Sequence, residues 1–300
     1  MKVGIIGLGN IAEKAYLPVI TSKEDIELVF CTRNVNKLNK LSNKYRIKEH
    51  TTSLKELISM GIDAAFVHTA TESHTETAKM LLENGINVYI DKPISYYYED
   101  ALNLAELSAK KDKILMVGFN RRFAPMYKSL KDNQKPDIII IQKNRVNLPD
   151  NVRRFIFDDF IHVVDTLRFL MDEDNMNINI NSLKKEKLLY NIVLQLSNNT
   201  TTAIGIMNRN SGISEETLEY MCSNKKFFID NLVETTKFEN GKEEIIKFND
   251  WDPILYRRGF YQIISEFLSS VEKNKIPSIT IEDSLKTHEI CEKIVKELTL

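Results

Sequence analysis

Short runs of apolar residues alternate with longer helical segments over the first 118 residues of the chain. Strands that read as unbroken apolar runs are typical of a parallel sheet that is covered on both faces. Right-handed crossovers between such strands predict a doubly wound α/β arrangement. The expected strands are Val3–Ile6, Ile26–Cys31, Ala64–Val67, Val88–Ile90 and Ile114–Val117, and the expected helices are Ala12–Ile20, Val35–Tyr45, Leu54–Met60, Thr75–Glu83 and Asp100–Lys110.

After Gly118 the pattern changes, which predicts two domains, residues 1–119 and residues 120–300. Strand-like stretches are followed by two closing helices, an order that favours an α+β domain with a mostly antiparallel sheet. The expected strands are Ile138–Gln142, Leu188–Leu196, Thr201–Met207, Thr217–Met221, Lys226–Asp230 and Glu243–Phe248, and the expected long helices are Phe155–Met171, Gly259–Lys273 and Ile281–Lys296.

Charge and cysteine content exclude several classes of protein. The 41 basic and 42 acidic residues nearly cancel, so no overall field favours nucleic acid or an anionic membrane as a partner. No apolar stretch is long enough to span a bilayer, and the first residues already read as a buried strand rather than a secretory signal. Cys31, Cys222 and Cys291 lie far apart, without the spacing of a disulfide framework or a zinc site. We therefore expect a cytoplasmic protein.

The first strand runs into a glycine-rich turn, Gly7-Leu8-Gly9-Asn10-Ile11-Ala12. In this GxGxxA pattern the first glycine allows a tight turn and the second lets the backbone approach a pyrophosphate. The small Ala12 lets the helix pack close to the sheet. Helix N-terminal amides then favour the phosphate charge. The motif predicts an N-terminal Rossmann domain that binds a dinucleotide, with a purely structural turn as the alternative.

The end of the second strand bears on which dinucleotide is bound. An acidic residue there would accept hydrogen bonds from the ribose 2′-hydroxyl of NAD, but the strand ends in Thr32-Arg33-Asn34, with Lys37 one helical turn further on. Arg33 can stack on adenine and, with Lys37, neutralise a 2′-phosphate. NADP(H) is therefore favoured as the cofactor and NAD(H) is possible. The alternative is that both cations are solvated surface charges.

Five motifs in a fixed order resemble those of the GFO/IDH/MocA oxidoreductase family, and the likeness extends over nearly the whole chain. It is nearest to the MviM branch of bacterial oxidoreductases. The motifs are Gly7–Ala12, Thr69-Ala70-Thr71-Glu72-Ser73-His74, Asp91-Lys92-Pro93, Gly118-Phe119-Asn120-Arg121-Arg122-Phe123 and Asp158-Asp159-Phe160-Ile161-His162-Val163-Val164-Asp165.

The resemblance implies hydride transfer between a nicotinamide and a carbon that carries a hydroxyl or carbonyl group. Lys92 occupies the place of the family lysine that lies beside the nicotinamide and the substrate oxygen. It can donate to the developing alkoxide. The family has glutamate before this lysine, whereas this chain has Asp91, one methylene shorter.

The resemblance also implies further cofactor contacts. The loop that contains Thr69, Ala70 and His74 passes the cofactor in relatives, although the usual asparagine of this loop is here Glu72. Asn120 and Arg122 belong to a segment that lies near the cofactor in the family.

The predicted helix Phe155–Met171 places Asp158, His162 and Asp165 on one stripe, because they are spaced i, i+4 and i+7. Phe160, Val163, Val164, Leu167 and Met171 fall on the opposite side, where they can pack into a core. Histidine is suited to carry the proton that accompanies hydride transfer, and a carboxylate fixes its tautomer. We expect His162 and Asp158 to be catalytic with Lys92, with Asp165 as the second choice of carboxylate.

Other interpretations of these residues remain open. The stripe can be a solvated helix face, but a metal site is not expected, because no further ligand cluster is visible. A dinucleotide-binding redox sensor or regulatory protein without turnover is the alternative function. A short-chain dehydrogenase is weaker: Tyr127 and Lys131 have its spacing but lack its glycine pattern. The expected partners are a sugar, polyol or related small molecule and a second copy of the chain, in a homodimer or higher homo-oligomer.

Overall fold

The computed structural model describes residues 1–173 and 175–299 and divides into two compact units. The first unit contains Met1–Gly118 together with Phe260–His288, and the second contains Phe119–Gly259 and the residues from Glu289 onward. The expected domains, 1–119 and 120–300, differ from this division because Phe260–His288 returns to the first unit. Among the described residues, no helix has both the length and the apolar character needed to cross a membrane.

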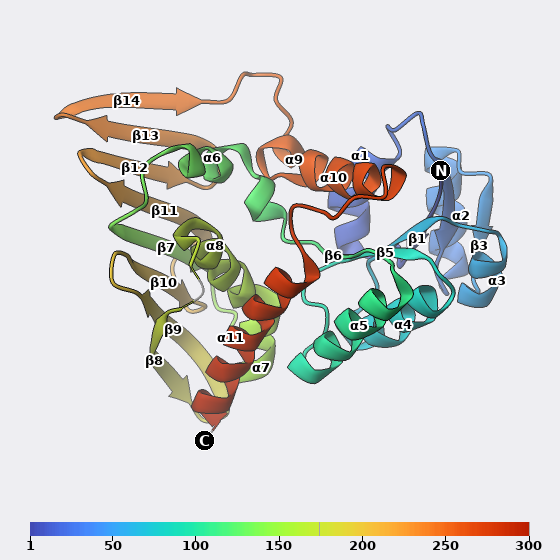
Figure 1. The fold of residues 1–300 in the computed structure, drawn as a ribbon, viewed down its shortest axis with the longest axis horizontal. Coiled ribbons are helices and arrows are strands. Elements are labelled where there is room, and N and C mark those ends of the chain that lie inside the picture. Colours follow the sequence, from blue (N-terminus) through green and yellow to red (C-terminus); the bar gives the residue numbers. More distant parts are fainter. Residues whose placement is uncertain (174, 300) are drawn as a thin grey trace. The chain divides into compact units, whose positions relative to one another are not determined.

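A six-stranded parallel sheet forms the centre of the first unit, in the order β3-β2-β1-β4-β5-β6 (Figure 1). This order reverses between β1 and β4, as in a Rossmann sheet, and confirms the predicted doubly wound fold. Only the short edge strand β3 was not expected. The strands are β1 (Lys2–Ile6), β2 (Glu27–Cys31), β3 (Glu49–Thr51), β4 (Ala64–Val67), β5 (Asn87–Ile90) and β6 (Leu115–Val117).

The helices of the first unit come from both ends of the chain. Phe66 on β4 and Tyr89 on β5 are direct neighbours in the sheet, and Phe267 of α10 packs edge-on against both rings, at centroid distances of 5.0 and 5.5 Å. Apolar burial of these aromatic rings explains why α10 belongs to the first unit. The helices are α1 (Leu17–Ile20), α2 (Val35–Tyr45), α3 (Leu54–Ser59), α4 (His74–Glu83), α5 (Tyr98–Lys111), α10 (Phe260–Glu272) and the beginning of α11 (Ile281–Thr299). A π-helical turn, Ala12–Tyr16, leads into α1.

The second unit contains an eight-stranded sheet in the order β14-β13-β12-β11-β7-β10-β9-β8. Neighbouring strands are antiparallel except for β7 and β10, which confirms the predicted mostly antiparallel sheet. The sequence analysis did not identify β8 or β13. The strands are β7 (Ile138–Asn144), β8 (Asn177–Lys185), β9 (Leu188–Ser197), β10 (Thr202–Asn208), β11 (Glu215–Cys222), β12 (Lys225–Asp230), β13 (Glu234–Glu239) and β14 (Lys242–Lys247).

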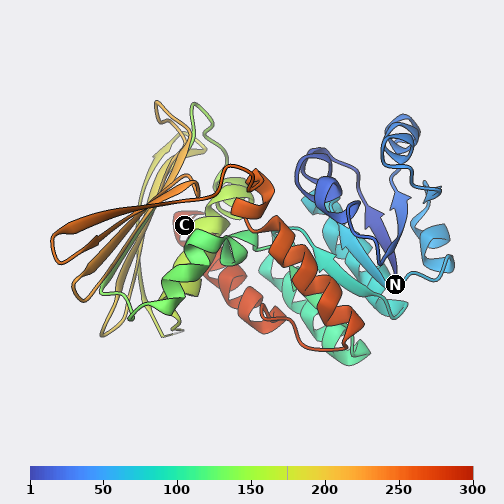
Figure 2. The same ribbon diagram turned by 90° about the horizontal axis from the view of Figure 1, so that it is seen from above.

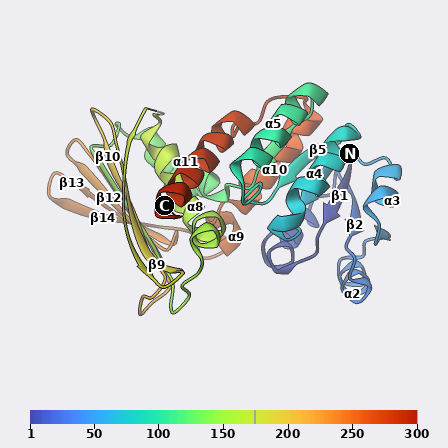
Figure 3. The ribbon, with the colours of Figure 1, turned by 90° about the horizontal axis from the view of Figure 1, so that it is seen from below.

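Helices cover one face of this eight-stranded sheet, and the other face carries no described helix (Figures 2 and 3). Buried residues therefore alternate with half-exposed ones along the central strands, as in Thr202–Asn208. The helices of the unit are α6 (Pro125–Lys128), α7 (Val152–Arg154), α8 (Ile161–Met171), α9 (Ile254–Arg257) and the end of α11; a π-helical segment, Phe155–Phe160, leads into α8.

Candidate active site

The turn after β1 has the shape that the GxGxxA pattern requires. Gly7 has a φ of +85°, and a Cβ atom there would lie 2.6 Å from the backbone nitrogen of Thr69 and 2.7 Å from the carbonyl oxygen of His68. Glycine is therefore needed at this position both for the conformation and for the space. Asn10 and Ile11 are exposed at the start of the following helix, whereas Ala12 is fully buried. This turn fits a dinucleotide phosphate, since open backbone at a helix start favours an anion.

The predicted adenosine-side residues lie at the start of α2. The side chain of Asn34 caps this helix by accepting from the backbone nitrogen of Lys37 at 3.0 Å. The ammonium of Lys37 lies 3.4 Å from a carboxylate oxygen of Glu13, so a carboxylate does lie at this corner, contrary to expectation. It comes from the π-helical turn Ala12–Tyr16, which precedes α1, rather than from the second strand. Arg33 is exposed and has no ion pair with the described residues.

His74 ties together the two loops that follow β4 and β5. Its Nδ1 lies 2.8 Å from the carbonyl oxygen of Pro93, and its Nε2 lies 3.1 Å from the carbonyl oxygen of Thr69. The ring is buried, and burial lowers its pKa, against the influence of the two carbonyl groups. Lys92 immediately precedes Pro93, so His74 stabilises the loop that carries the candidate catalytic lysine.

The side chain of Asp91 is bonded within its own loop. Its Oδ1 accepts from the backbone nitrogen of Lys92 at 2.9 Å and lies 3.4 Å from the Tyr16 hydroxyl, which in turn lies 2.9 Å from the Tyr89 hydroxyl. Burial raises the pKa of this carboxyl group, and Lys92 opposes the rise. Next to this network, the His68 ring packs against Tyr16 at a centroid distance of 3.9 Å, with the ring planes tilted by 33°. Both nitrogens of His68 are buried and have no hydrogen-bond partner among the described residues.

In the second unit, Asp158 and His162 are the only residues of 155–168, all of them described, that are not buried. Phe160, Val163, Val164, Leu167 and Met171 are buried, as predicted. Val163 and Leu167 press so closely on β10 that a Cβ atom on Gly205 would lie 2.6 and 3.0 Å from their side chains. The helix is thus packed against the sheet on one side, and on the other side it presents the carboxylate of Asp158 and the imidazole of His162.

Asp165, the second choice of carboxylate, is buried and bonded to Arg122. The guanidinium donates three hydrogen bonds of 2.6 to 3.1 Å to its two oxygens. The same guanidinium lies over the rings of Phe119 and Phe169, and the side chain of Asn120 donates to the carbonyl oxygen of Arg258 at 2.8 Å. The described contacts of Asn120 and Arg122 are therefore internal to the second unit. They favour Asp158 over Asp165 as the partner of His162.

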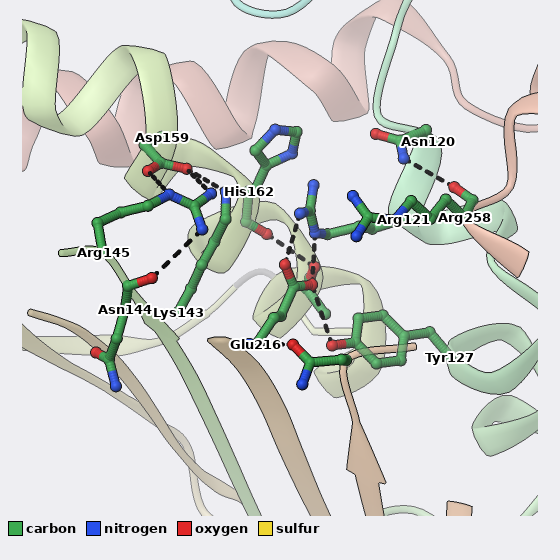
Figure 4. Close-up of polar contacts among 12 residues, drawn as sticks. Asn120, Arg121, Tyr127, Lys143, Asn144, Arg145, Asp159, His162, Glu216 and Arg258 are labelled. Atoms are coloured by element: carbon green, nitrogen blue, oxygen red, sulfur yellow. Dashed lines mark hydrogen bonds and ion pairs between the residues drawn. The ribbon is translucent and has the colours of Figure 1, made fainter. Parts of the chain in front are cut away.

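Two charge clusters near His162 were not predicted (Figure 4). In one, the carboxylate of Asp159 accepts from Lys143 and Arg145. In the other, Glu216 accepts from Arg121 through two hydrogen bonds of 2.6 Å and from the Tyr127 hydroxyl at 3.2 Å.

Weak signals in the sequence mark these clusters. Lys143 continues the inward-facing series Ile139, Ile141 on β7, a place where lysine is rare. Tyr127 and Lys131, whose spacing suggested a short-chain dehydrogenase, contact different carboxylates. The Tyr127 hydroxyl donates to Glu216, and the Lys131 ammonium lies 2.9 Å from Asp172.

Comparison with known proteins gives a consistent result. Residues 1–119 match the GFO_IDH_MocA family, described as an oxidoreductase family with an NAD-binding Rossmann fold, and residues 125–241 match the YceM-like C-terminal domain. A Gfo/Idh/MocA family oxidoreductase from Vibrio cholerae has 32% identity and a TM-score of 0.94, with all of both chains covered. The dehydrogenase MviM from Clostridium difficile has 35% identity and a TM-score of 0.95, with 99% of each chain covered. Myo-inositol 2-dehydrogenase from Thermotoga maritima is 24% identical over 318 residues, which cover 94% of this chain and 92% of the relative.

The parallel sheet and its glycine turn define an NAD-binding oxidoreductase. The chain belongs to the GFO/IDH/MocA oxidoreductase family. Within the family, it is similar over its whole length to the MviM dehydrogenase.

Proposed function

We propose that the protein interconverts a secondary hydroxyl group and a carbonyl group on a sugar, polyol or related small molecule. The observation that carries this proposal is the pair Asp158 and His162, the only side chains to emerge from an otherwise buried stretch of helix, residues 155–168. The polyol class is supported by the inositol dehydrogenase among the relatives. A bound nicotinamide would supply the hydride exchange.

The chain itself supplies proton transfer and electrostatic stabilisation. His162 removes the proton of the substrate hydroxyl during oxidation and returns it during reduction. Asp158, one turn earlier, orients the imidazole and stabilises its protonated form. Lys92 donates a hydrogen bond to the oxygen on which negative charge develops.

NADP(H) is the proposed cofactor, with NAD(H) as the second choice. The preference for a 2′-phosphate now depends mainly on Arg33, because Lys37 pairs with Glu13. Arg33 is exposed and has no ion pair among the described residues. The turn residues Gly7, Gly9, Asn10, Ile11 and Ala12 would hold the pyrophosphate. Thr32, Thr69, Ala70, His74, Asp91, Asn120 and Arg122 remain candidates for the cofactor site.

We further propose a homodimer or higher homo-oligomer in the cytoplasm. Half-exposed apolar side chains, among them Ile140, Ile204, Ile206 and Phe228, lie on the strand positions that alternate with the buried ones. A broad face of this kind is commonly buried by a partner subunit. The three cysteines are free and buried, in keeping with a reducing compartment. Analytical ultracentrifugation tests the oligomeric state.

The decisive experiment is a screen of sugars, inositols and aldehydes for a change in NAD(P)H absorbance, followed by His162→Ala and Lys92→Ala on each active substrate. We expect each variant to lower kcat by about 100-fold or more and to leave cofactor affinity within about threefold. His50→Ala, at an exposed histidine of β3, is the matched control. Cofactor binding without turnover of any compound would favour the alternative function, a dinucleotide-binding redox sensor or regulatory protein. Full activity in both variants would contradict the proposed catalytic residues.

A further inference from the structure

Lys143 occupies an inward-facing position near the end of β7, a central strand of the second unit's sheet. It follows Ile139 and Ile141 on the buried face of β7, and its side chain is 2% exposed. A third isoleucine would continue this apolar series without bringing a charge into the core. Because replacing a buried ion pair by apolar residues is often neutral or stabilising, stability alone does not account for this lysine.

The ammonium of Lys143 contacts Asp159, the residue after Asp158. Arg145, two positions further along the chain, donates to the same carboxylate from Nε at 3.0 Å and from Nη2 at 3.1 Å. Asp159 is itself buried, so two cations from one stretch of the chain hold the segment from which Asp158 projects.

That segment, Phe155–Phe160, is a π-helical turn, in which the backbone nitrogen of Ile161 bonds to the carbonyl oxygen of Ile156. Wide turns of this kind are rare and occur frequently at functional sites. Relaxation to an ordinary α-helical turn would shift the register of Asp158 against His162. A contact that holds the wide turn therefore controls how these two side chains are presented.

Four charged side chains act on Lys143: Asp159, Arg121, Glu216 and Arg145. Glu216 lies directly opposite it on β11 and is bonded to Arg121, while Asp159 belongs to the helical segment and is bonded to Arg145 (Figure 4). Burial lowers the pKa of Lys143 to about 7, Asp159 opposes this shift, and Arg121 and Arg145 add to it. Burial alone would raise the pKa of Glu216, but Arg121 outweighs it and lowers that pKa to about 2.

We propose that Lys143 is a positioning residue, whose bond to Asp159 holds the wide turn in the form that presents Asp158 and His162 to the substrate. The inference rests on the proposed function, because it assigns Lys143 a role in the same proton transfer. Lys143 acts through Asp159 and the backbone, and does not itself take part in the reaction.

The test compares Lys143→Met, Lys143→Arg and Lys226→Met in the full-length protein. Lys226 is the control. It is a half-exposed lysine on β12 that forms an ion pair with Glu219 at 2.5 Å, and it lies at the other end of the strand pairing from Lys143. Two properties are measured: kcat and KM on the active polyol, and the imidazole resonances of His162 in histidine-labelled protein. The resonances of His162 are identified by their loss in His162→Gln.

We expect Lys143→Met to lower kcat by about 10- to 100-fold, as misplaced catalytic groups do, with KM within about twofold. The His162 resonances should move in the same variant, and Lys143→Arg should restore part of both properties. Lys226→Met should change neither. If Lys143→Met does not fold, Asp159→Asn, which keeps the side-chain shape and weakens the ion pair, must give the same two changes.

Two outcomes overturn the inference. A folded Lys143→Met protein with the wild-type kcat and His162 resonances shows that the lysine is only part of the core. A raised KM with unchanged kcat shows that it binds substrate directly. Failure of the proposed function is separate, since the resonances of His162 report on its position even if no polyol is turned over.

Discussion

Arg122 holds Asp165 through three hydrogen bonds of 2.6 to 3.1 Å, although the two residues lie far apart in the sequence. Both side chains are buried, with exposed fractions of 8% and 2%. Asp165 thus belongs to a structural ion pair, while Asp158, seven residues earlier, lies at the surface of the same helical stretch. The two carboxylates of the stripe therefore differ in environment, and substitution should separate their effects.

Asp165→Asn should lower the free energy of unfolding by about 3–5 kcal/mol, because it leaves a buried guanidinium without its counter-charge. Asp158→Asn should change stability by less than about 1 kcal/mol and lower kcat by about 10-fold or more. Urea unfolding and steady-state kinetics on both variants check this. The assignment is wrong if Asp158→Asn is the unstable variant and Asp165→Asn the inactive one.

NADPH should bind more tightly than NADH, and Arg33→Ala should reduce the preference by about 10-fold, the range of one charge-assisted hydrogen bond. Glu13→Gln should strengthen NADPH binding, because it releases Lys37 from its ion pair at 3.4 Å. Titration calorimetry with both cofactors measures these affinities. Equal affinity for the two cofactors in the wild-type protein would remove the argument from Arg33.

His68 should make the protein sensitive to acid. Burial lowers the pKa of this histidine from 6.5 to about 3, so the unfolded chain takes up a proton at a pH where the folded chain does not. Stability is therefore lost as the pH falls from about 6.5 to about 3, by at most about 1.4 kcal/mol per pH unit. His68→Phe removes this loss and should move the acid-unfolding midpoint to lower pH. His50→Phe, at an exposed position, is the control, and parallel stability curves for wild type and His68→Phe would contradict the prediction.

Gly205→Ala should lower the free energy of unfolding by about 1–3 kcal/mol, because the added methyl group meets Val163 and Leu167 at 3.0 Å or less. Gly212→Ala is the matched control, since a Cβ atom there meets nothing within 4 Å. Denaturant unfolding of both variants measures the difference. Equal stability of the two would mean that α8 can move away from β10 at no cost.

The sequence predicted the first sheet well because its strands are buried on both faces. The strand β8 was missed because asparagine is rare in strands and is typical of turns, although it alternates with isoleucine at the start of Asn177–Lys185, and β13 was missed because its residues are largely charged or polar. Solvent-facing positions on a half-covered sheet carry no strong strand signal.

The candidate site was predicted only where a local pattern marked it. Asp158 and His162 are one helical turn apart, so periodicity alone brings them together. The contact between Lys143 and Asp159 joins a strand to a helix, and that of Arg121 and Glu216 joins a short 3₁₀ turn to a strand. Such pairings depend on the tertiary fold, and neither residue spacing nor composition contains them.

The packing of Phe267 against Phe66 and Tyr89 has a consequence for biosynthesis. A ribosome completes β1 to β6 long before it reaches α10. Phe66 and Tyr89 on the nascent sheet therefore stay without the packing of Phe267 until the intervening second unit has been synthesised. The cofactor-binding unit is therefore the first to begin folding and cannot finish until nearly the whole chain has been translated.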